Sequence, residues 1–226
     1  MASRTPKVLL VHGMGRTPLS MWRLARALRR AGTATELFGY VAAWQTVEQI
    51  VGRLRARLET MADGDYVVIG HSLGGLLLRA AVAALPPGIR RPHRIIMLAT
   101  PNHSPRLAQR FEHAWWYRAL NGDAGALLAH ESRMAEIPHL DVPCTIIAGT
   151  RGVSGRWSPF GNETNDGLLS VTETEMAGAD EWISLPLRHP FIMNDAGVRE
   201  LVKRRCLMGA TSDERRATRD VKTVSS

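Results

Sequence analysis

A serine between two glycines stands in the first third of the chain, where Gly70-His71-Ser72-Leu73-Gly74 fits the pattern G-x-S-x-G. An apolar run at residues 66–69 precedes it directly, and a stretch rich in helix-forming residues follows it. Glycines flank such a serine because the strained turn from strand to helix leaves no room for side chains beside it. This placement predicts that the Ser72 hydroxyl emerges at the carboxyl end of a strand, although an ordinary glycine-rich turn is the alternative.

A serine hydroxyl is a poor nucleophile until a base removes its proton, so a histidine is required later in the chain. His189 follows the last predicted strand and precedes the last predicted helix, which places it at the same sheet edge as Ser72. His12 and His71 adjoin the first loop and the serine turn, where backbone hydrogen bonding or packing is the expected role. The other five histidines have no strand end behind them: His93, His103, His113, His130 and His139. We therefore predict that His189 is the base.

An acidic residue should orient that histidine and stabilise its charged form. Asp166, in Asn165-Asp166-Gly167, lies in the loop after the predicted strand 145–148 and precedes His189 in the chain. Asp166 is the predicted acid, and Glu163 is its nearest rival. The alternative for Asp166 is that the Asn-Asp-Gly turn exists for its shape alone. Three other acidic residues belong to the opposite sheet edge, since they come just before a strand: Asp141, Asp180 and Glu181.

Two backbone N–H groups should stabilise the negative oxygen that forms during acyl transfer. One is expected from Leu73, the residue after the nucleophile. The other is expected from Met14, in the loop His12-Gly13-Met14-Gly15, whose glycines let the main chain approach a substrate closely. The alternative is that this segment is only a glycine-rich loop.

These residues need a scaffold that brings strand ends together, and the pattern of apolar runs predicts one. Strands and helices alternate, and the strands are apolar throughout, which indicates a parallel sheet covered on both faces. The prediction is an α/β fold, a three-layer α/β/α sandwich with a mostly parallel sheet. The predicted strands are residues 7–11, 35–41, 66–69, 94–99, 145–148 and 182–185, and the clearest helices are 18–31, 47–61, 73–85 and 194–206.

Length and composition fit one globular domain. The 226 residues are 45% hydrophobic and 22% charged, so we expect a single domain at 1–208 and a disordered tail at 209–226. The net charge of +8 is spread over helix-like segments, without a nucleic-acid-binding motif, so no nucleic-acid partner is expected. Residues 1–11 hold no signal-peptide pattern, and no run reaches the roughly 18 apolar residues of a membrane span. We therefore expect a soluble, cytoplasmic protein. In that compartment the two cysteines are expected to be reduced.

Taken together, the motifs resemble the α/β-hydrolase superfamily, and within it the small lipase- and esterase-like bacterial members. The resemblance extends from about residue 7 to 206 and rests on 11–15 (VHGMG), 70–75 (GHSLGG), 99–103 (ATPNH), 165–167 (NDG) and His189. It implies a triad of Ser72, Asp166 and His189, an oxyanion hole from Met14 and Leu73, and no metal or cofactor. It also implies a minimal member, because the chain begins at what would be the third core strand of the family.

The resemblance implies a small-molecule ester or lipid substrate. Residues 104–140 are expected to form helices over the site and the acyl pocket, with His12, His71, Trp115 and Trp116 as candidate pocket residues, although the two tryptophans could also be ordinary core. The predicted activity is hydrolysis of a carboxylic ester through an acyl-enzyme intermediate. Thioesterase, amidase and acyltransferase activity on the same triad stay open, as does a binding protein without turnover, because fold does not choose among them. The sequence predicts no oligomeric state.

Overall fold

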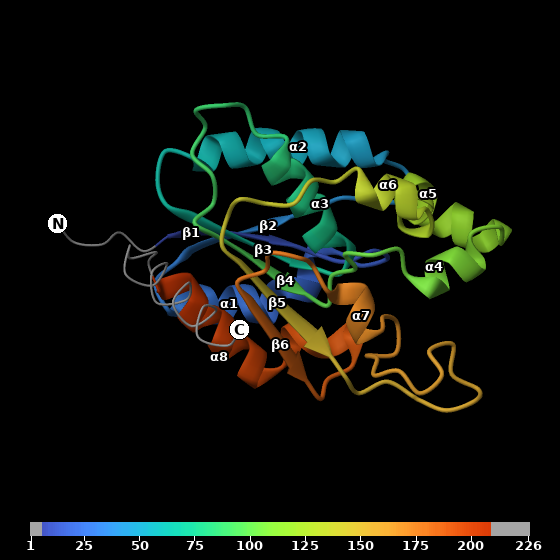
Figure 1. Cartoon of the computed structure of the whole chain (residues 1–226). Coiled ribbons are helices and arrows are strands. Elements are labelled where there is room, and N and C mark those ends of the chain that lie inside the picture. The colour runs from blue at the N-terminus through green and yellow to red at the C-terminus, as the bar shows by residue number, and fades with distance from the viewer. Residues whose placement is uncertain (1–5, 209–226) are drawn as a thin grey trace, which may run out of the picture.

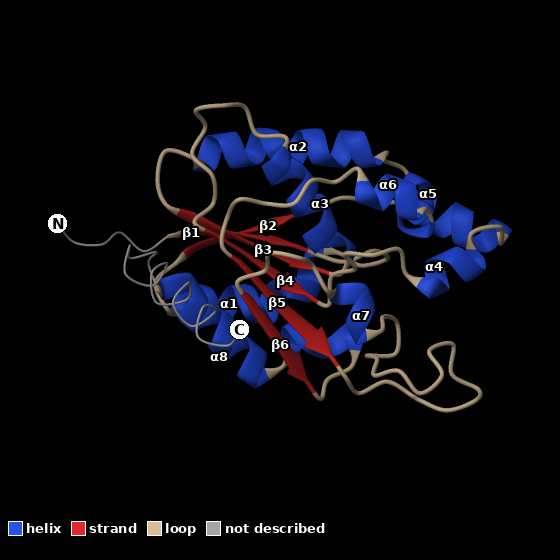
Figure 2. Cartoon of the chain, in the orientation of Figure 1, coloured by secondary structure: helices blue, strands red, loops and turns tan. Residues whose placement is uncertain are grey.

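Six parallel strands form one sheet in the computed structural model, which describes residues 6–208. The predicted tail at 209–226 lies outside the described residues. The strand order is β2-β1-β3-β4-β5-β6, and every neighbouring pair is parallel. The strands are β1 (Lys7–Val11), β2 (Ala34–Phe38), β3 (Tyr66–His71), β4 (Arg94–Leu98), β5 (Cys144–Gly149) and β6 (Glu181–Leu185). All six carboxyl ends therefore meet at one edge of the sheet (Figures 1 and 2).

Helices cover both faces of this sheet, as predicted. Helices α2 (Val47–Met61) and α3 (Leu73–Ala83) lie on one face, and α1 (Trp22–Arg30) and α8 (Ala196–Leu207) lie on the other (Figure 1). The remaining helices follow β4 and β5: α4 (Arg106–Phe111), α5 (Trp115–Ala129), α6 (Glu131–Ala135) and α7 (Val171–Thr174). Two short 3₁₀ helices, η1 (Pro18–Met21) and η2 (His189–Asn194), precede α1 and α8. The prediction of a three-layer α/β/α sandwich is confirmed.

Alternate strand residues supply two separate cores. In β1, Leu9 and Val11 join the cluster under α2 and α3, whereas Val8 and Leu10 join the cluster under α1 and α8. These four side chains are at most 1% exposed. Since both faces of each central strand are buried, the strands must be apolar throughout, which explains the continuous apolar runs in the sequence.

Several predicted boundaries differ from the structure by a few residues, and three of the differences have a visible cause or form. The second strand ends at Phe38 and not at residue 41, because Tyr40 leaves the sheet to stack on His12 with ring centroids 4.3 Å apart. The predicted first helix opens as the 3₁₀ helix η1, and α1 begins only at Trp22. The last helix begins at Ala196, capped by Asp195, because residues 189–194 form η2.

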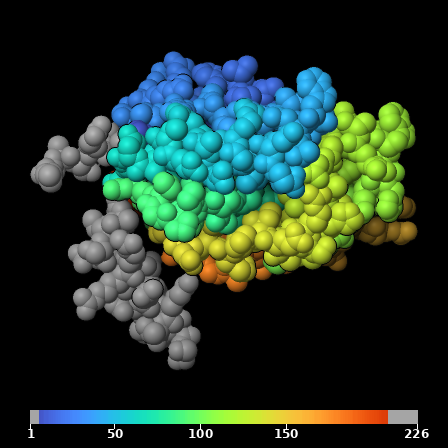
Figure 3. Space-filling model, turned by 90° about the horizontal axis from the view of Figure 1, so that it is seen from above, coloured from blue at the N-terminus to red at the C-terminus, as the bar shows by residue number. Residues whose placement is uncertain are grey.

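The segment 104–140 contains α4, α5 and α6, and it extends beyond the carboxyl edge of the sheet. Seen from above, its yellow-green residues form one end of the molecule (Figure 3). Helix α5 is kinked at Gly122 (φ 52°, ψ −141°), where a Cβ atom would lie 2.6 Å from the Ala42 carbonyl oxygen. Asp123 accepts a hydrogen bond from the Val47 N–H at 2.9 Å, which joins α5 to the start of α2. None of the described helices combines the length and apolar character that crossing a bilayer requires.

Candidate active site

Ser72 stands at a sharp turn between β3 and α3. Its backbone has φ 52° and ψ −128°, a conformation that non-glycine residues rarely adopt and that costs about 1–3 kcal/mol. The N–H of Ser72 donates to the Leu98 carbonyl oxygen at 2.8 Å, so the end of β4 holds the turn in place. Strain retained at a single residue that joins a strand to a helix is typical of a nucleophile turn.

The glycines around Ser72 are required by close backbone contacts. A Cβ atom at Gly70 would lie 2.3 Å from the Gly75 backbone, and one at Gly74 would lie 2.4 Å from the His12 carbonyl oxygen. No side chain fits at such distances. The absence of these side chains lets α3 begin directly against β3 and β1, and this close approach fixes the direction in which Ser72 leaves the sheet.

Ser72, His189 and Asp166 form one chain of hydrogen bonds. His189 Nε2 lies 3.0 Å from Ser72 Oγ, and His189 Nδ1 lies 2.7 Å from Asp166 Oδ2. With the Nδ1–H donating to the carboxylate, Nε2 is free to accept from the hydroxyl. His189 is 4% exposed and Asp166 2%, so water does not compete strongly for these bonds. Ser72 directly follows β3, Asp166 lies in the loop after β5, and His189 follows β6.

The Asp166 carboxylate is held by its own turn. Oδ1 accepts from the N–H groups of Leu168 at 2.9 Å and Leu169 at 2.8 Å, which leaves Oδ2 for the histidine. The main chain adds a second link, because the His189 N–H donates to the Asp166 carbonyl oxygen at 3.0 Å. Glu163, the rival acid, instead binds Arg106 and Thr172. The structure therefore brings Asp166, and not Glu163, to His189.

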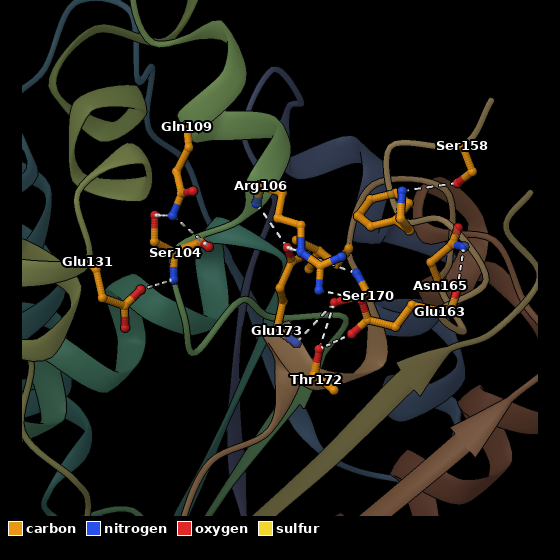
Figure 4. A network of polar contacts seen from close by, with 12 residues as sticks. Ser104, Arg106, Gln109, Glu131, Ser158, Glu163, Asn165, Ser170, Thr172 and Glu173 are labelled. Carbon is orange, nitrogen blue, oxygen red and sulfur yellow. Dashed lines mark hydrogen bonds and ion pairs between the residues drawn. The ribbon is translucent and has the colours of Figure 1, made fainter. Parts of the chain in front are cut away.

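A polar network ties the loop of Asp166 to the segment that follows β4 (Figure 4). The buried Glu173 carboxylate accepts from the backbone N–H groups of Arg106 and Ser170, both at 2.9 Å. The backbone carbonyl oxygen of Glu173 accepts from the N–H groups of Asn102 and His103 at 2.8 and 3.2 Å. Burial raises the pKa of the Glu173 carboxyl, although the N–H groups of Arg106 and Ser170 and the Arg106 guanidinium act against that shift.

His71 and His12 are buried and bonded to the main chain. His71 Nε2 donates to the His189 carbonyl oxygen at 3.1 Å, and burial holds the pKa of His71 well below its ordinary value, with a further contribution from His189. His12 Nδ1 donates to the Gly13 carbonyl oxygen at 2.8 Å, and burial also lowers the pKa of His12. Both rings therefore stay neutral and support the walls of the site. A contact with substrate stays a prediction for both.

The two predicted oxyanion donors belong to Leu73, which follows Ser72, and to the loop that lies against the Ser72 turn. Leu73 is the first residue of α3, where the backbone N–H has no intrahelical partner. The loop with Met14 lies directly against the turn, since a Cβ atom at Gly13 would be 3.1 Å from Ser72 Cβ. This arrangement is compatible with an oxyanion hole, and the assignment of Met14 and Leu73 stays a prediction.

Trp115 and Trp116 lie at the start of α5 and do not belong to the core. They are 79% and 42% exposed, whereas the neighbouring Tyr117 is buried. The Trp116 ring contacts Phe111 and Tyr117, with centroids 5.3 and 6.1 Å away. Their role as pocket residues stays a prediction. Within residues 6–208 no cluster of three or more histidine, cysteine, aspartate or glutamate side chains is suited to bind a metal ion.

A family model described as the alpha/beta hydrolase family matches residues 8–219. The chain belongs to this family. The expected superfamily is thereby confirmed for this α/β hydrolase, and the strand order and the serine turn agree with it. A comparison with curated protein sequences finds no match.

Solved structures similar to this α/β hydrolase share its fold at low identity. Lipase BlEst2 from Bacillus licheniformis, in its propeptide form, has a TM-score of 0.73 at 17% identity, covering 92% of this chain and 52% of the lipase. Phospholipase PlaB from Legionella pneumophila has a TM-score of 0.76 at 14% identity, covering 98% of this chain and 62% of PlaB. A metagenomic carboxyl esterase has a TM-score of 0.66 at 17% identity, covering 84% and 66%. The α/β hydrolase thus spans between about half and two thirds of these relatives.

Sequence reasoning missed Glu173 and Arg106 in this α/β hydrolase. Ser170 and Glu173 form a capping box, in which the Glu173 N–H donates to Ser170 Oγ at 3.3 Å. The pattern S-x-x-E at 170–173 could have indicated this helix start. The Glu173 carboxylate also accepts a hydrogen bond from the N–H of Arg106, which is distant in the sequence. No local sequence pattern indicates that contact.

Proposed function

We propose that this α/β hydrolase is a serine hydrolase that cleaves carboxylic esters through an acyl-enzyme intermediate. Ser72 is the nucleophile, His189 the general base and Asp166 the residue that orients it. The observation that carries the proposal is the continuous hydrogen-bonded chain from Ser72 Oγ through His189 to Asp166, which starts at a strained turn. Nucleophile, base and orienting acid in mutual contact define a triad by role and geometry, independently of sequence position.

Each step follows from these contacts. Ser72 Oγ attacks the ester carbonyl carbon while its proton passes to His189 Nε2, and Asp166 stabilises the imidazolium that forms. The N–H groups of Leu73 and Met14 bind the negative oxygen of the tetrahedral intermediate. The bond to the leaving oxygen then breaks, and His189 gives its proton to the departing alcohol. A water molecule, deprotonated by His189, attacks the acyl-enzyme and releases the carboxylic acid and free Ser72.

The choice of an ester is supported by the names of the structural neighbours, which include a lipase, a phospholipase and a carboxyl esterase. The same triad can act on thioesters or amides, or transfer the acyl group to another acceptor. Rates on p-nitrophenyl esters of graded chain length, compared with matched thioesters and anilides, test this choice. The proposal requires the largest kcat/KM on an oxygen ester, and a preference for a thioester or an amide would overturn that part of it.

Labelling with a fluorophosphonate probe tests the triad directly. We expect one adduct, located on Ser72 by mass spectrometry, and no adduct in Ser72→Ala. His189→Ala should slow labelling by at least about a thousandfold, because the hydroxyl loses its base. Ser154→Ala, a change at an exposed serine, is the matched control and should label like the wild type. No adduct on folded wild-type protein would instead favour a binding protein without turnover.

A further inference from the structure

Two helices of this α/β hydrolase carry much of its positive charge. Helices α1 and α8 together hold eight basic residues and one acidic residue, Glu200, which gives them a net charge of +7. The whole chain has a net charge of +8. The basic residues are Arg23, Arg26, Arg29, Arg30, Arg199, Lys203, Arg204 and Arg205. Charge of one sign on two neighbouring elements creates a local field that attracts anions.

A surface cavity of about 530 Å³ lies between these two helices. Both helices lie on the same face of the sheet (Figure 1). Trp22 lines the cavity and is 45% exposed, and the Arg26 guanidinium lies 5.9 Å from the centroid of its ring. Five basic side chains also line it, three from α1 and two from α8: Arg23, Arg26, Arg30, Arg199 and Lys203. Because α1 and α8 are far apart in the sequence, only folding brings these charges together.

Four of the five basic side chains have no acidic partner. Within residues 6–208, no carboxylate makes an ion pair with Arg23, Arg26, Arg30 or Arg199. Arg199 donates to the Asn194 carbonyl oxygen, which is a neutral acceptor and leaves the positive charge in place.

The acidic side chains bonded to α8 are already engaged. Glu200 is the acidic residue that lines the cavity, so five basic side chains face one carboxylate there. The contacts of these acids are Glu200 with Lys203 and Arg204, Glu181 with Arg205, and the N-cap Asp195 with the Val198 N–H. The cavity therefore stays strongly positive.

Like charges are neighbours along both helices. Arg26 lies three residues after Arg23 and four before Arg30, and Lys203 lies four residues after Arg199. Helical side chains at these spacings lie next to one another, so pairs of equal charge destabilise the helix that carries them. An anion bound in the cavity would relieve this repulsion.

We propose that the cavity between α1 and α8 binds the polyphosphate group of a small ligand. Its volume lies within the range of about 300–1,000 Å³ that is usual for small-molecule sites. The guanidinium fork of arginine matches the oxygens of a phosphate group with paired hydrogen bonds. A diphosphate or triphosphate concentrates several negative charges in a small volume, which fits five cations around one cavity. A single carboxylate would neutralise one of them.

Trp22 indicates how such a ligand could be a nucleotide. An indole ring beside the arginines offers a flat face on which a base can stack. Nucleoside triphosphates and inorganic polyphosphate share the charged group, so the binding experiment must distinguish them. Ser72, Asp166 and His189 do not line this cavity, and the proposal does not rest on the proposed function.

Calorimetric titration of the whole protein with inorganic triphosphate tests the site. We expect one site per chain, an affinity that falls as salt rises, and much weaker binding of orthophosphate. Arg26→Ala and Arg199→Ala, one change on each helix, should each weaken triphosphate binding about tenfold, because charge-assisted hydrogen bonds to phosphate are lost. Thermal unfolding should show that both variants fold.

The matched control is Arg110→Ala, which removes the same charge from α4. Arg110 is exposed, makes no ion pair with a described residue and does not line the cavity, so this variant should bind like the wild type. Equal weakening in Arg110→Ala and Arg26→Ala would show a general charge effect and overturn the site. No saturable binding of triphosphate would overturn it as well.

Titration with ATP identifies the source of the polyphosphate group. Tighter binding of ATP than of triphosphate, with the difference lost in Trp22→Ala, assigns the site to a nucleotide. Equal affinities assign it to the polyphosphate group alone, and both results support the proposal. A short single-stranded oligonucleotide that binds more tightly than ATP through Arg26 and Arg199 would overturn the small ligand in favour of nucleic acid.

Discussion

Two regions meet at the carboxyl edge of the sheet, and they are built differently. Ser72 and His189 follow β3 and β6 closely, Asp166 lies in the loop after β5, and hydrogen bonds to the main chain and to one another hold all three. The segment 104–140 and the loop 150–163 surround them, with Trp115 and Trp157 mostly in solvent. The proposed catalytic residues lie at the edge of the sheet, whereas the connections around them have a length and shape that the sheet does not determine.

This difference has a physical basis. Parallel strands in a fixed order bring Ser72 and His189 to one edge. Asp166 lies farther along the connection after β5, and the hydrogen bond from the His189 N–H to its carbonyl oxygen holds it there. The connections must only cover that edge, and many arrangements of short helices could do so. We therefore expect substitutions in the first region to abolish activity or folding, and substitutions in the second to change which substrate is bound.

The largest effect should come from Asp166→Asn. The amide cannot hold His189 in the tautomer that accepts the serine proton, and equivalent changes lower kcat about 10⁴-fold. Folding should be preserved, because the side-chain oxygen can still accept from Leu168 and Leu169. The measurement is kcat on a short p-nitrophenyl ester.

Glu163→Gln is the matched control for this change and should cost less than about tenfold in kcat, since Glu163 binds Arg106 and not His189. A larger loss in Glu163→Gln than in Asp166→Asn would reverse the assignment of the acid. It would also contradict the distinction between the two regions, because Glu163 belongs to the loop 150–163 and binds Arg106.

A smaller effect, on stability, should follow from Gly74→Ala. The new methyl group would lie 2.4 Å from the His12 carbonyl oxygen and 2.5 Å from that of Val11, and backbone atoms cannot move aside easily. We expect a loss of about 3 kcal/mol in the free energy of unfolding, measured with denaturant. Gly52→Ala, in α2 where a Cβ meets nothing within 4 Å, should instead stabilise the protein by about 0.5–1 kcal/mol. Equal effects of the two changes would show that the turn is not tightly packed.

The same contrast explains what could be predicted from the sequence. The parallel sheet, and the meeting of Ser72, Asp166 and His189, follow from apolar runs and from the rule that strand ends share an edge. The ends of elements were less predictable, because the contacts that set them are tertiary. The second strand stops at Phe38 since Tyr40 packs on His12, and no local pattern reports that partner.

The surroundings of the triad were the least predictable part. Trp115 and Trp116 could be assigned neither to pocket nor to core from sequence, because the kink of α5 at Gly122 depends on its packing against Ala42. The acceptor role of Glu173 toward Arg106 joins residues 67 positions apart, beyond the reach of any local pattern. Arrangements of this kind become visible only in the folded chain.

Glu173 links the two regions, so its replacement gives the finest test of how independent they are. In Glu173→Gln one of the two carboxylate oxygens becomes an NH₂ group, which cannot accept from Arg106 or Ser170. We expect a loss of about 2 kcal/mol in the free energy of unfolding, the cost of a buried donor left unpaired. Glu175→Gln, an exposed change two residues away, is the control and should stay within about 0.5 kcal/mol of the wild type.

The pH dependence of that loss sharpens the test. Because burial raises the pKa of Glu173 above its ordinary value of 4.5, the folded state binds this proton more tightly than the unfolded chain does. The resulting stabilisation is complete below pH 4.5 and is lost as the pH rises through the folded-state pKa. Glutamine does not titrate, so the gap in unfolding free energy between wild type and Glu173→Gln should narrow as the pH rises above 4.5. A gap that widens would mean that the donors outweigh burial, and that Glu173 joins the two regions as a carboxylate.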